Sequence, residues 1–332
     1  MLVRKNDTAL FVAGDSNIFF PALVALTSIS KHNPGKFDFF MCFEKEHLTP
    51  RMQVLLDLHE IRFIDSTSLG IMDEIRAMKK MPGWWPLEVY LNWAMPEYFG
   101  DSGYKYAIKV DYDILCIAPY EELTKHLAKN QPFTAISTGG PTNGVNKYTA
   151  DKILSTMSLS SEQAKAINVG FVLFDIQVCV ETNFFVTFRT LHDIISQQEP
   201  RIPLDEQEVA SILMHQMSND TAEYLPERYN MRVRRSPTTN NDFIPNIANI
   251  HYITRYKPWK PLNAADVRGL GKTFHPIVPM YRNLWIRYAQ SLAFCDSFLT
   301  EKPLDELQLI GVVSNGTKGI HNGIKEMKVK ST

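Results

Sequence analysis

Short apolar runs alternate with helix-like stretches through the first half of the chain, and this alternation constrains the fold more than any other feature. Four runs have the length of buried strands: 9–13, 37–43, 61–64 and 104–110. Helical spacing of apolar residues lies between them, at 21–30, 48–59 and 88–98. Because strands joined by helical crossovers build a largely parallel sheet, we expect an α/β fold.

The second half continues this pattern with longer interruptions. Strands are expected at 133–137, 167–174 and 247–253, and helices at 177–197, 206–217 and 281–298. With 332 residues, 45% of them hydrophobic, the chain can bury one large core. We therefore expect a single main domain over 1–270, followed by a helical and basic extension over 271–332.

Charge and cysteine content narrow the class of protein. Lys and Arg total 35 against 36 Asp and Glu, so the chain lacks the basic excess that binds nucleic-acid phosphates. The four cysteines form no C-x-x-C pair, which favours buried reduced thiols over a zinc or redox motif. The apolar run 8–13 is too short for a signal-peptide core or a membrane helix. We expect a cytoplasmic protein with no nucleic-acid partner.

Two carboxylates, Asp111 and Asp113, directly follow the strand expected at 104–110. Residues two apart in an extended strand end face the same side, so the pair can share one hard divalent cation. Ligands of open α/β sheets gather at the carboxyl ends of strands, where this pair lies. On its own the pair also fits a solvated turn.

A later segment adds two groups that suit the same chemistry. His251 emerges from the strand expected at 247–253, and Lys257 follows it. Imidazole can complete a Mn²⁺ coordination shell, and a lysine ammonium can neutralise a phosphate. A single histidine near a strand is commonly structural, but beside Asp111 and Asp113 it favours a site for a metal and a diphosphate.

Five segments, in this order, resemble those of the family 8 retaining glycosyltransferases: FVAGDSN at 11–17, RFID at 62–65, KVDYD at 109–113, INVGFVLFD at 167–175 and HYITRYKPW at 251–259. The chain is similar to bacterial lipopolysaccharide galactosyltransferases and glucosyltransferases and, more distantly, to glycogenin. The resemblance implies a GT-A fold, which is Rossmann-like with a mixed, mainly parallel central sheet, and makes 1–270 the catalytic domain. It also implies transfer of a hexose from UDP-glucose or UDP-galactose to a glycan, glycolipid or protein acceptor.

By this resemblance, Asp111, Asp113 and His251 would hold Mn²⁺ or Mg²⁺. Lys257 would add positive charge to the leaving diphosphate, and Asp111 and Tyr112 would also contact the UDP-sugar.

The resemblance also assigns residues to the nucleotide and the sugar. Ala13, Asp15 and Asn17 would contact the uridine, although 14–17 also fits a plain turn of small polar residues. Asn168 would reach the donor sugar, and Gly170 would let the backbone approach closely. Both of these also fit ordinary strand punctuation.

Glu206 and Gln207 match the family's D-Q-D stretch and would lie near the anomeric carbon. A structural alternative makes Asp205 a helix N-cap, with Glu208 closing a capping box, and the register is open by one residue. Retention is compatible with a glycosyl intermediate on Glu206 or with attack from the face of the departing diphosphate. We favour attack from that face.

Several departures from the family leave the donor sugar open: Ile18 and Phe19 replace a tyrosine, Asn92 an arginine, and Thr254 a glycine. Two other functions are considered. A sugar-1-phosphate nucleotidyltransferase is disfavoured because the turn at 14–17 has one glycine and no basic residue. A non-catalytic module that binds a nucleotide sugar is disfavoured by the intact set of metal and diphosphate residues.

The acceptor is the least defined partner. Aromatic residues could present faces to an acceptor sugar: Trp84, Trp85, Tyr256 and Trp259. The expected helix 281–298 could instead touch the inner face of a membrane carrying a lipid-linked acceptor, or pack on the main domain.

Overall fold

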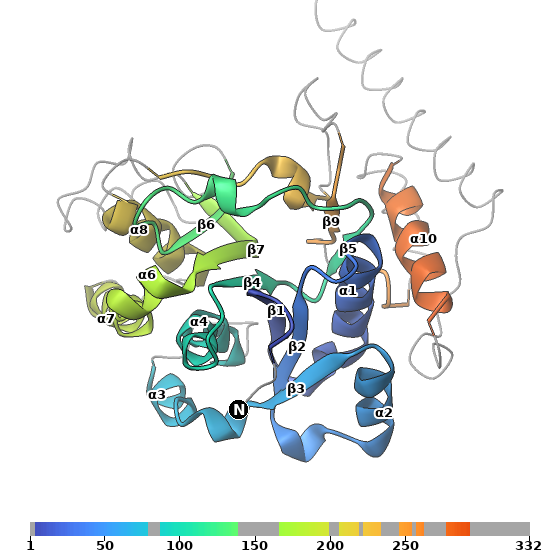
Figure 1. Cartoon of the computed structure of the whole chain (residues 1–332), viewed down its shortest axis with the longest axis horizontal. Coiled ribbons are helices and arrows are strands. Elements are labelled where there is room, and N and C mark those ends of the chain that lie inside the picture. Colours follow the sequence, from blue (N-terminus) through green and yellow to red (C-terminus); the bar gives the residue numbers. More distant parts are fainter. Residues whose placement is uncertain are drawn as a thin grey trace, which may run out of the picture.

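The computed structural model describes residues 4–78, 87–138, 166–198, 206–218, 222–233, 246–253, 257–261 and 277–292. Its centre is a six-stranded sheet in the order β3-β2-β1-β4-β7-β6 (Figure 1). The strands are β1 (Thr8–Ala13), β2 (Asp38–Phe43), β3 (Ile61–Asp65), β4 (Tyr106–Val110), β6 (Phe133–Ser137) and β7 (Ile167–Asp175). Strands β3, β2, β1 and β4 pair in parallel, and β7 pairs antiparallel with both β4 and β6. The expected mixed, mainly parallel α/β sheet is confirmed.

Alternation along the strands divides the core into two layers. Leu10 and Val12 of β1 face one apolar cluster, and Ala9 and Phe11 face the other, because successive side chains of a strand point to opposite faces. Helices α1 (Phe19–His32), α2 (Pro50–Leu58) and α10 (Ile277–Gln290) contribute to the first cluster. Helices α3 (Met72–Ala77), α4 (Leu91–Asp101), α6 (Ile176–Glu181), α7 (Phe184–Gln198) and α8 (Glu206–Ser218) contribute to the second. Figure 1 shows these two groups on opposite sides of β1.

One helix begins where a local sequence signal places it, and two of the expected helices differ in the structure. Thr49 caps α2 and accepts from the backbone N–H of Met52 at 3.2 Å, as its place before Pro50 indicates. The single helix expected at 177–197 is wrong: Asn183, at φ 47°, adopts a left-handed conformation and separates α6 from α7. The helix expected at 281–298 begins earlier, at Ile277, and ends at Gln290.

A second, three-stranded sheet carries the late part of the chain back to the end of β4. It has the order β5-β9-β8, from β5 (Ile114–Cys116), β9 (Asn249–His251) and β8 (Met231–Arg232). Strand β9 falls within the strand expected at 247–253, whereas β5 and β8 were not expected. Strand β5 follows Asp113 directly and pairs antiparallel with β9, which places Ile114 opposite His251.

Helix α10 packs on the main domain through its apolar face. Trp285 is fully buried and its ring lies 6.2 Å from that of Phe20 and 5.2 Å from that of Trp259. Met280 and Leu284 remain exposed on the same helix. The expected boundary near residue 270 and the basic tail lie outside the described residues, so the division into 1–270 and 271–332 stays a prediction.

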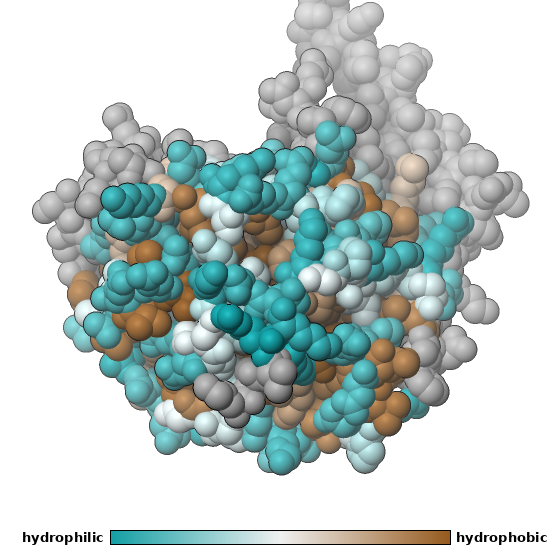
Figure 2. Space-filling view, viewed as in Figure 1, coloured by the Kyte–Doolittle hydropathy of each residue, from teal (hydrophilic) through white to brown (hydrophobic). Residues whose placement is uncertain are grey.

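The described residues contain neither a membrane-spanning helix nor a reactive thiol. No described helix is long and apolar enough to cross a bilayer. On the face shown in Figure 2, hydrophilic residues surround smaller hydrophobic areas. Cys42, Cys116 and Cys179 are free and buried, and burial raises the pKa of Cys116 to about 12. Such thiols are inert at neutral pH.

Candidate active site

The backbone of the Asp111–Asp113 segment is clamped from both sides. The N–H of Asp111 donates to the carbonyl of Gly170 on β7 at 2.8 Å, and the N–H of Tyr252 donates to the carbonyl of Asp113 at 2.9 Å. The Asp111 side chain is 30% exposed and that of Asp113 only 7%. Asp111 is therefore the more accessible of the two carboxylates, and Asp113 is almost enclosed by protein.

His251 completes a group with both carboxylates. Its Nε2 lies 2.9 Å from Asp113 Oδ1 and 3.5 Å from Asp111 Oδ2. Two acceptor oxygens that face one ring nitrogen need a positive centre between them, either a proton or a metal ion. We call Asp111, Asp113 and His251 the buried cluster.

Two lysines orient the carboxylates of the buried cluster. Lys109 donates to Asp111 Oδ1 and, at 2.6 Å, to the Val169 carbonyl. Lys257 donates to Asp113 Oδ2 and, at 2.7 Å, to the carbonyl of Tyr252. Because each lysine takes one oxygen of its carboxylate, the other oxygen is left to face His251.

The charges of this group support one another. Burial alone would lower the pKa of Lys109, but the neighbouring carboxylates, chiefly Asp111 and Glu206, raise it. Burial alone would raise the pKa of Asp113, but positive charge at His251 and Lys257 holds it well below its usual range. Lys109 and Asp113 therefore both remain ionised at neutral pH. Lys109 lies inside the KVDYD segment, yet its role was not expected.

The donor set of the buried cluster fits a divalent cation. Each residue offers one ligand atom, and these atoms all lie within 4.8 Å of one another. Two carboxylate oxygens and one imidazole nitrogen suit Mn²⁺ or Mg²⁺. An octahedral ion would keep further positions for oxygens of a bound ligand.

A cavity of about 440 Å³ opens over the buried cluster and reaches the end of β1. The residues that the sequence assigned to the site line this cavity, with the exception of Gly170: Ala13, Asp15, Asn17, Asp111, Tyr112, Asp113, Asn168, Glu206, Gln207, His251 and Lys257. Sequence-distant segments thus meet around one space large enough for a small ligand.

The turn after β1 is held by its own side chain. Asp15 Oδ1 accepts from the N–H of Asn17 at 2.9 Å and caps the 3₁₀ helix η1 (Ser16–Ile18). This is the plain turn that the sequence allowed, and Asp15 and Asn17 also line the cavity. The structural interpretation is therefore confirmed, whereas the contact of Asp15 and Asn17 with a nucleotide stays a prediction.

Gly170 lies beneath the ring of His251. A Cβ at Gly170 would meet His251 Cε1 at 2.3 Å and Nδ1 at 2.6 Å, so any larger residue would displace the imidazole. The close approach that the glycine permits is thus an approach of His251.

Glu206 and Gln207 begin α8 at the edge of the cavity. Trp93 of α4 donates its indole N–H to Glu206 Oε2 at 2.9 Å, and its ring stacks on Phe188 at 4.9 Å. Asn168 donates to Gln207 Oε1 at 2.9 Å. Asp205 lies outside the described residues, and so do the capping box and the register that depend on it.

The residues that depart from the family have clear places. Ile18 lines the cavity and Phe19 is buried in the core. Asn92 also lines the cavity, and its amide donates to the carbonyl of Val89 at 2.9 Å. Trp259 lines the cavity, and its ring lies 5.8 Å from that of Tyr112 and 5.2 Å from that of Trp285. Thr254, Tyr256, Trp84 and Trp85 lie outside the described residues.

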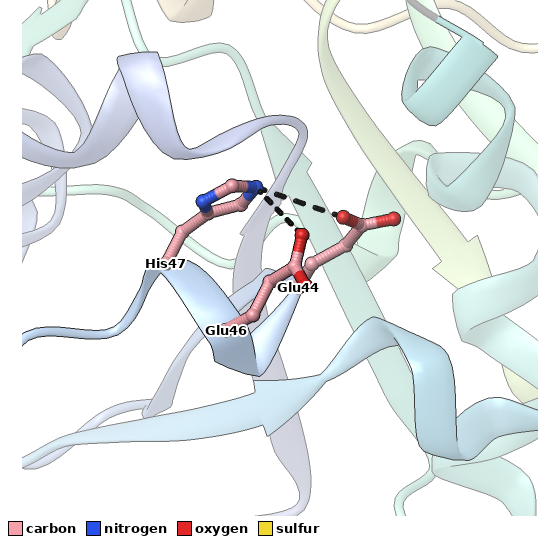
Figure 3. Close-up of side chains that lie close together, drawn as sticks. All are labelled: Glu44, Glu46 and His47. Atoms are coloured by element: carbon pink, nitrogen blue, oxygen red, sulfur yellow. Dashed lines mark ion pairs between the residues drawn. The ribbon is translucent and has the colours of Figure 1, made fainter.

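A second cluster of similar composition lies on the surface. His47 Nε2 is 3.7 Å from a Glu44 carboxylate oxygen and 3.4 Å from one of Glu46 (Figure 3). Arg76 also pairs with Glu44, at 3.4 Å. We call Glu44, Glu46 and His47 the exposed cluster. Its three residues lie on one short stretch of chain around the 3₁₀ helix η2 (Lys45–His47), away from the cavity lining.

Comparison with solved structures supports the fold. The chain is similar to the galactosyltransferase LgtC solved in complex with donor and acceptor sugar analogs: 15% identity, TM-score 0.58, covering 92% of this chain and 100% of that one. It is also similar to the bifunctional glycosyltransferase WbbM, at 14% identity and TM-score 0.56, covering 90% of this chain. The chain spans only 52% of the length of WbbM.

A mammalian structure shares the same fold. Mouse xyloside xylosyltransferase 1 matches at 12% identity and TM-score 0.54, covering 75% of this chain and 98% of that one. Among curated proteins, none matches the sequence.

The sequence itself carries the family assignment. The model of glycosyl transferase family 8 matches residues 9–263, which include all of β1 except Thr8, the Asp111–Asp113 segment and His251. A match over this much of the chain, together with the GT-A fold of the neighbours, shows that the protein belongs to glycosyl transferase family 8 and is a glycosyltransferase.

Proposed function

We propose that the protein transfers a hexose from UDP-glucose or UDP-galactose to a carbohydrate or glycolipid acceptor, with retention of configuration and with the help of a divalent cation. The observation that carries this proposal is the convergence of the buried cluster and Lys257 in the wall of the same cavity. The similar protein LgtC was solved in complex with donor and acceptor sugar analogs, and this supports a sugar donor for the present chain.

The buried cluster supplies the ligands of the cation. Mn²⁺ or Mg²⁺ held there would stabilise the negative charge that grows on the leaving diphosphate. Lys257 would stabilise the same negative charge. Its ammonium has three N–H groups, and the two contacts with Asp113 and Tyr252 leave one to donate to a phosphate oxygen.

The other cavity residues bind the two ends of the donor. Ala13, Asp15 and Asn17 would contact the uridine, and Asp111 and Tyr112 would flank the diphosphate and the sugar. Because these two groups lie at or just after the ends of the neighbouring parallel strands β1 and β4 and line the same cavity, one extended ligand can reach both.

Asn168, Glu206 and Gln207 would surround the donor sugar. Gln207 Oε1 accepts from Asn168, so its N–H₂ group is left to donate to a sugar oxygen. Glu206 accepts from Trp93, and a hydrogen bond to the charged form makes a carboxylate a weaker nucleophile. The Trp93 contact supports attack from the face of the departing diphosphate rather than a covalent glycosyl intermediate on Glu206.

The experiment is UDP release from UDP-glucose and UDP-galactose with Mn²⁺, beside the same reactions with excess chelator. We expect release that chelator abolishes and that Mn²⁺ restores. Release that ignores chelator would remove the cation from the proposal. No release from either donor, with or without sugar acceptors, would favour a module that binds a nucleotide sugar without turning it over.

Glu206 offers a separate test of the mechanism. With attack from the diphosphate face, Glu206→Gln retains measurable transfer and no glycosylated peptide forms on the parent enzyme. Complete loss of transfer, together with a glycosyl group trapped on Glu206 by mass spectrometry, would establish the double displacement instead.

Exposed apolar residues of helix α10 would contact the inner face of a cytoplasmic membrane that carries a lipid-linked acceptor. Its exposed Met280 and Leu284 can touch lipid while Trp285 stays packed. Flotation of the full chain with anionic liposomes, beside a Met280→Glu, Leu284→Glu variant, tests this contact, and equal flotation of the two proteins would contradict it.

A further inference from the structure

Asn230 is a fully buried amide that connects two residues of the site. It lies between the 3₁₀ helix η6 (Glu227–Tyr229) and β8, and no motif in the sequence marks it. Its Oδ1 is 2.7 Å from His251 Nδ1, and its Nδ2 is 2.7 Å from Asn168 Oδ1. The amide therefore touches the far side of the imidazole from the carboxylates.

The direction of these hydrogen bonds is set by the backbone. The N–H of Gly170, which can only donate, lies 3.1 Å from Asn168 Oδ1. That atom must therefore accept, and Asn230 must present its N–H₂ group to it. The carbonyl of Asn230 then faces His251 Nδ1, and this contact is a hydrogen bond only if Nδ1 carries a proton.

Gly170 makes room for the His251 ring beside this chain of hydrogen bonds. An ideal Cβ at Gly170 would lie 2.3 Å from His251 Cε1, so the imidazole occupies the space that a side chain would take. The same residue thus admits the ring and starts the chain of hydrogen bonds that ends on it.

We propose that Asn230 is a positioning residue that keeps a proton on His251 Nδ1, so that Nε2 is the nitrogen that meets the cation. The proposal rests on the metal site of the proposed function. A histidine that binds a metal through one nitrogen commonly donates its other N–H to an oxygen, which fixes the tautomer and the ring orientation. Here the oxygen that accepts is the side-chain carbonyl of Asn230. The orientation of that amide is fixed through Asn168 by the main-chain N–H of Gly170.

The test compares Asn230→Leu with Asn230→Asp in the full chain, without any donor. Leucine removes both the acceptor for Nδ1–H and the donor to Asn168, whereas aspartate removes only the donor and still accepts from Nδ1–H. Free Mn²⁺ measured by electron paramagnetic resonance should show affinity about 10–100-fold weaker for Asn230→Leu. Asn230→Asp should stay within about threefold of the parent, because a carboxylate can serve as the same acceptor.

Asn249→Leu is the matched control. Asn249 is equally buried, on the same strand as His251, and it bonds to the Tyr229 carbonyl and the Tyr120 hydroxyl. Its loss should lower the thermal midpoint without changing Mn²⁺ affinity. Equal weakening by all three substitutions would mean that Asn230 acts only through packing, and would overturn the proposal.

The protonated nitrogen is read directly by long-range ¹H–¹⁵N correlation on ¹⁵N-histidine-labelled protein, with His251 assigned from a His251→Gln spectrum. Nδ1 should carry the proton both with and without Mg²⁺. A bare Nδ1 in the parent protein overturns the proposal. If the parent binds no Mn²⁺, the cation of the proposed function fails, while this spectrum still decides the role of Asn230.

Discussion

The buried cluster and the exposed cluster each combine two carboxylates with a histidine, but they differ in how their side chains are held. In the buried cluster the histidine side chain is 4% exposed and comes from a strand distant in sequence from the carboxylates. In the exposed cluster the histidine side chain is 49% exposed and one carboxylate is 73% exposed, and all three residues are neighbours in the chain.

Partners outside each cluster make the larger difference. Every ligand of the buried cluster has a second polar partner that fixes it, namely Lys109, Lys257 or Asn230. His47 makes both its contacts through Nε2, and its Nδ1 has no hydrogen-bond partner among the described residues. A metal site needs ligands that are already aimed, so composition alone does not identify one.

The largest difference between the two clusters is expected when Asp113 is replaced. Asp113→Asn removes a ligand charge and leaves Lys257 beside a neutral amide, so Mn²⁺-dependent UDP release should fall about 100–1,000-fold. Glu44→Gln makes the same chemical change in the exposed cluster and should leave release unchanged. Initial rates at saturating Mn²⁺ measure both variants, and comparable losses in the two would show that the clusters are not distinct.

A backbone position tests whether aim, rather than ligand identity, matters. Gly170→Ala keeps every ligand but its Cβ would force the His251 ring to move, so Mn²⁺ affinity should fall about 10–100-fold. Gly35→Ala is the control: Gly35 has φ 69° and open space around it, so alanine there costs about 1 kcal/mol of stability through backbone strain alone. Unchanged Mn²⁺ affinity in Gly170→Ala would contradict the packing of His251 on this glycine.

Stability as a function of pH tests, without any ligand, whether Asp113 of the buried cluster is held ionised by its neighbours. Because the pKa of Asp113 is lower in the folded protein than in the unfolded chain, its contribution is present above about pH 4 and is lost as the pH falls through the folded-state pKa. Asp113→Asn should therefore cost about 3 kcal/mol in urea unfolding at neutral pH. The difference should shrink in acid, and a difference that stays constant down to pH 3 would show that Asp113 is not held ionised by its neighbours.

The sequence predicted the parts of the site that depend on local pattern. A continuous apolar run marked β1, a mainly apolar segment marked β4, and the spacing of Asp111 and Asp113 at a strand end indicated carboxylates on one side. The proximity of His251 came from resemblance rather than from pattern, because the short β5 that pairs with β9 has no periodicity of its own to detect.

The partners that aim the ligands could not be predicted in the same way. Asn230 and Trp93 act through contacts with residues far away in sequence, and a single buried asparagine or tryptophan carries no signal for such a contact. Lys109 was visible beside the aspartates, yet only burial shows that its ammonium turns inward to Asp111 and Val169. Long-range packing, which the sequence alone does not display, decides these positions.

The smallest expected effect is at His47, and it sharpens the comparison from the other side. His47→Ala should leave Mn²⁺ affinity within about twofold and change the free energy of unfolding by less than about 1 kcal/mol, because exposed ion pairs contribute little in water. Calorimetric titration with Mn²⁺ on His47→Ala and on His251→Ala measures the contrast directly. If removal of His47 weakened the same binding event, exposure would not disqualify a cluster, and the assignment of the cation to the buried cluster would fail.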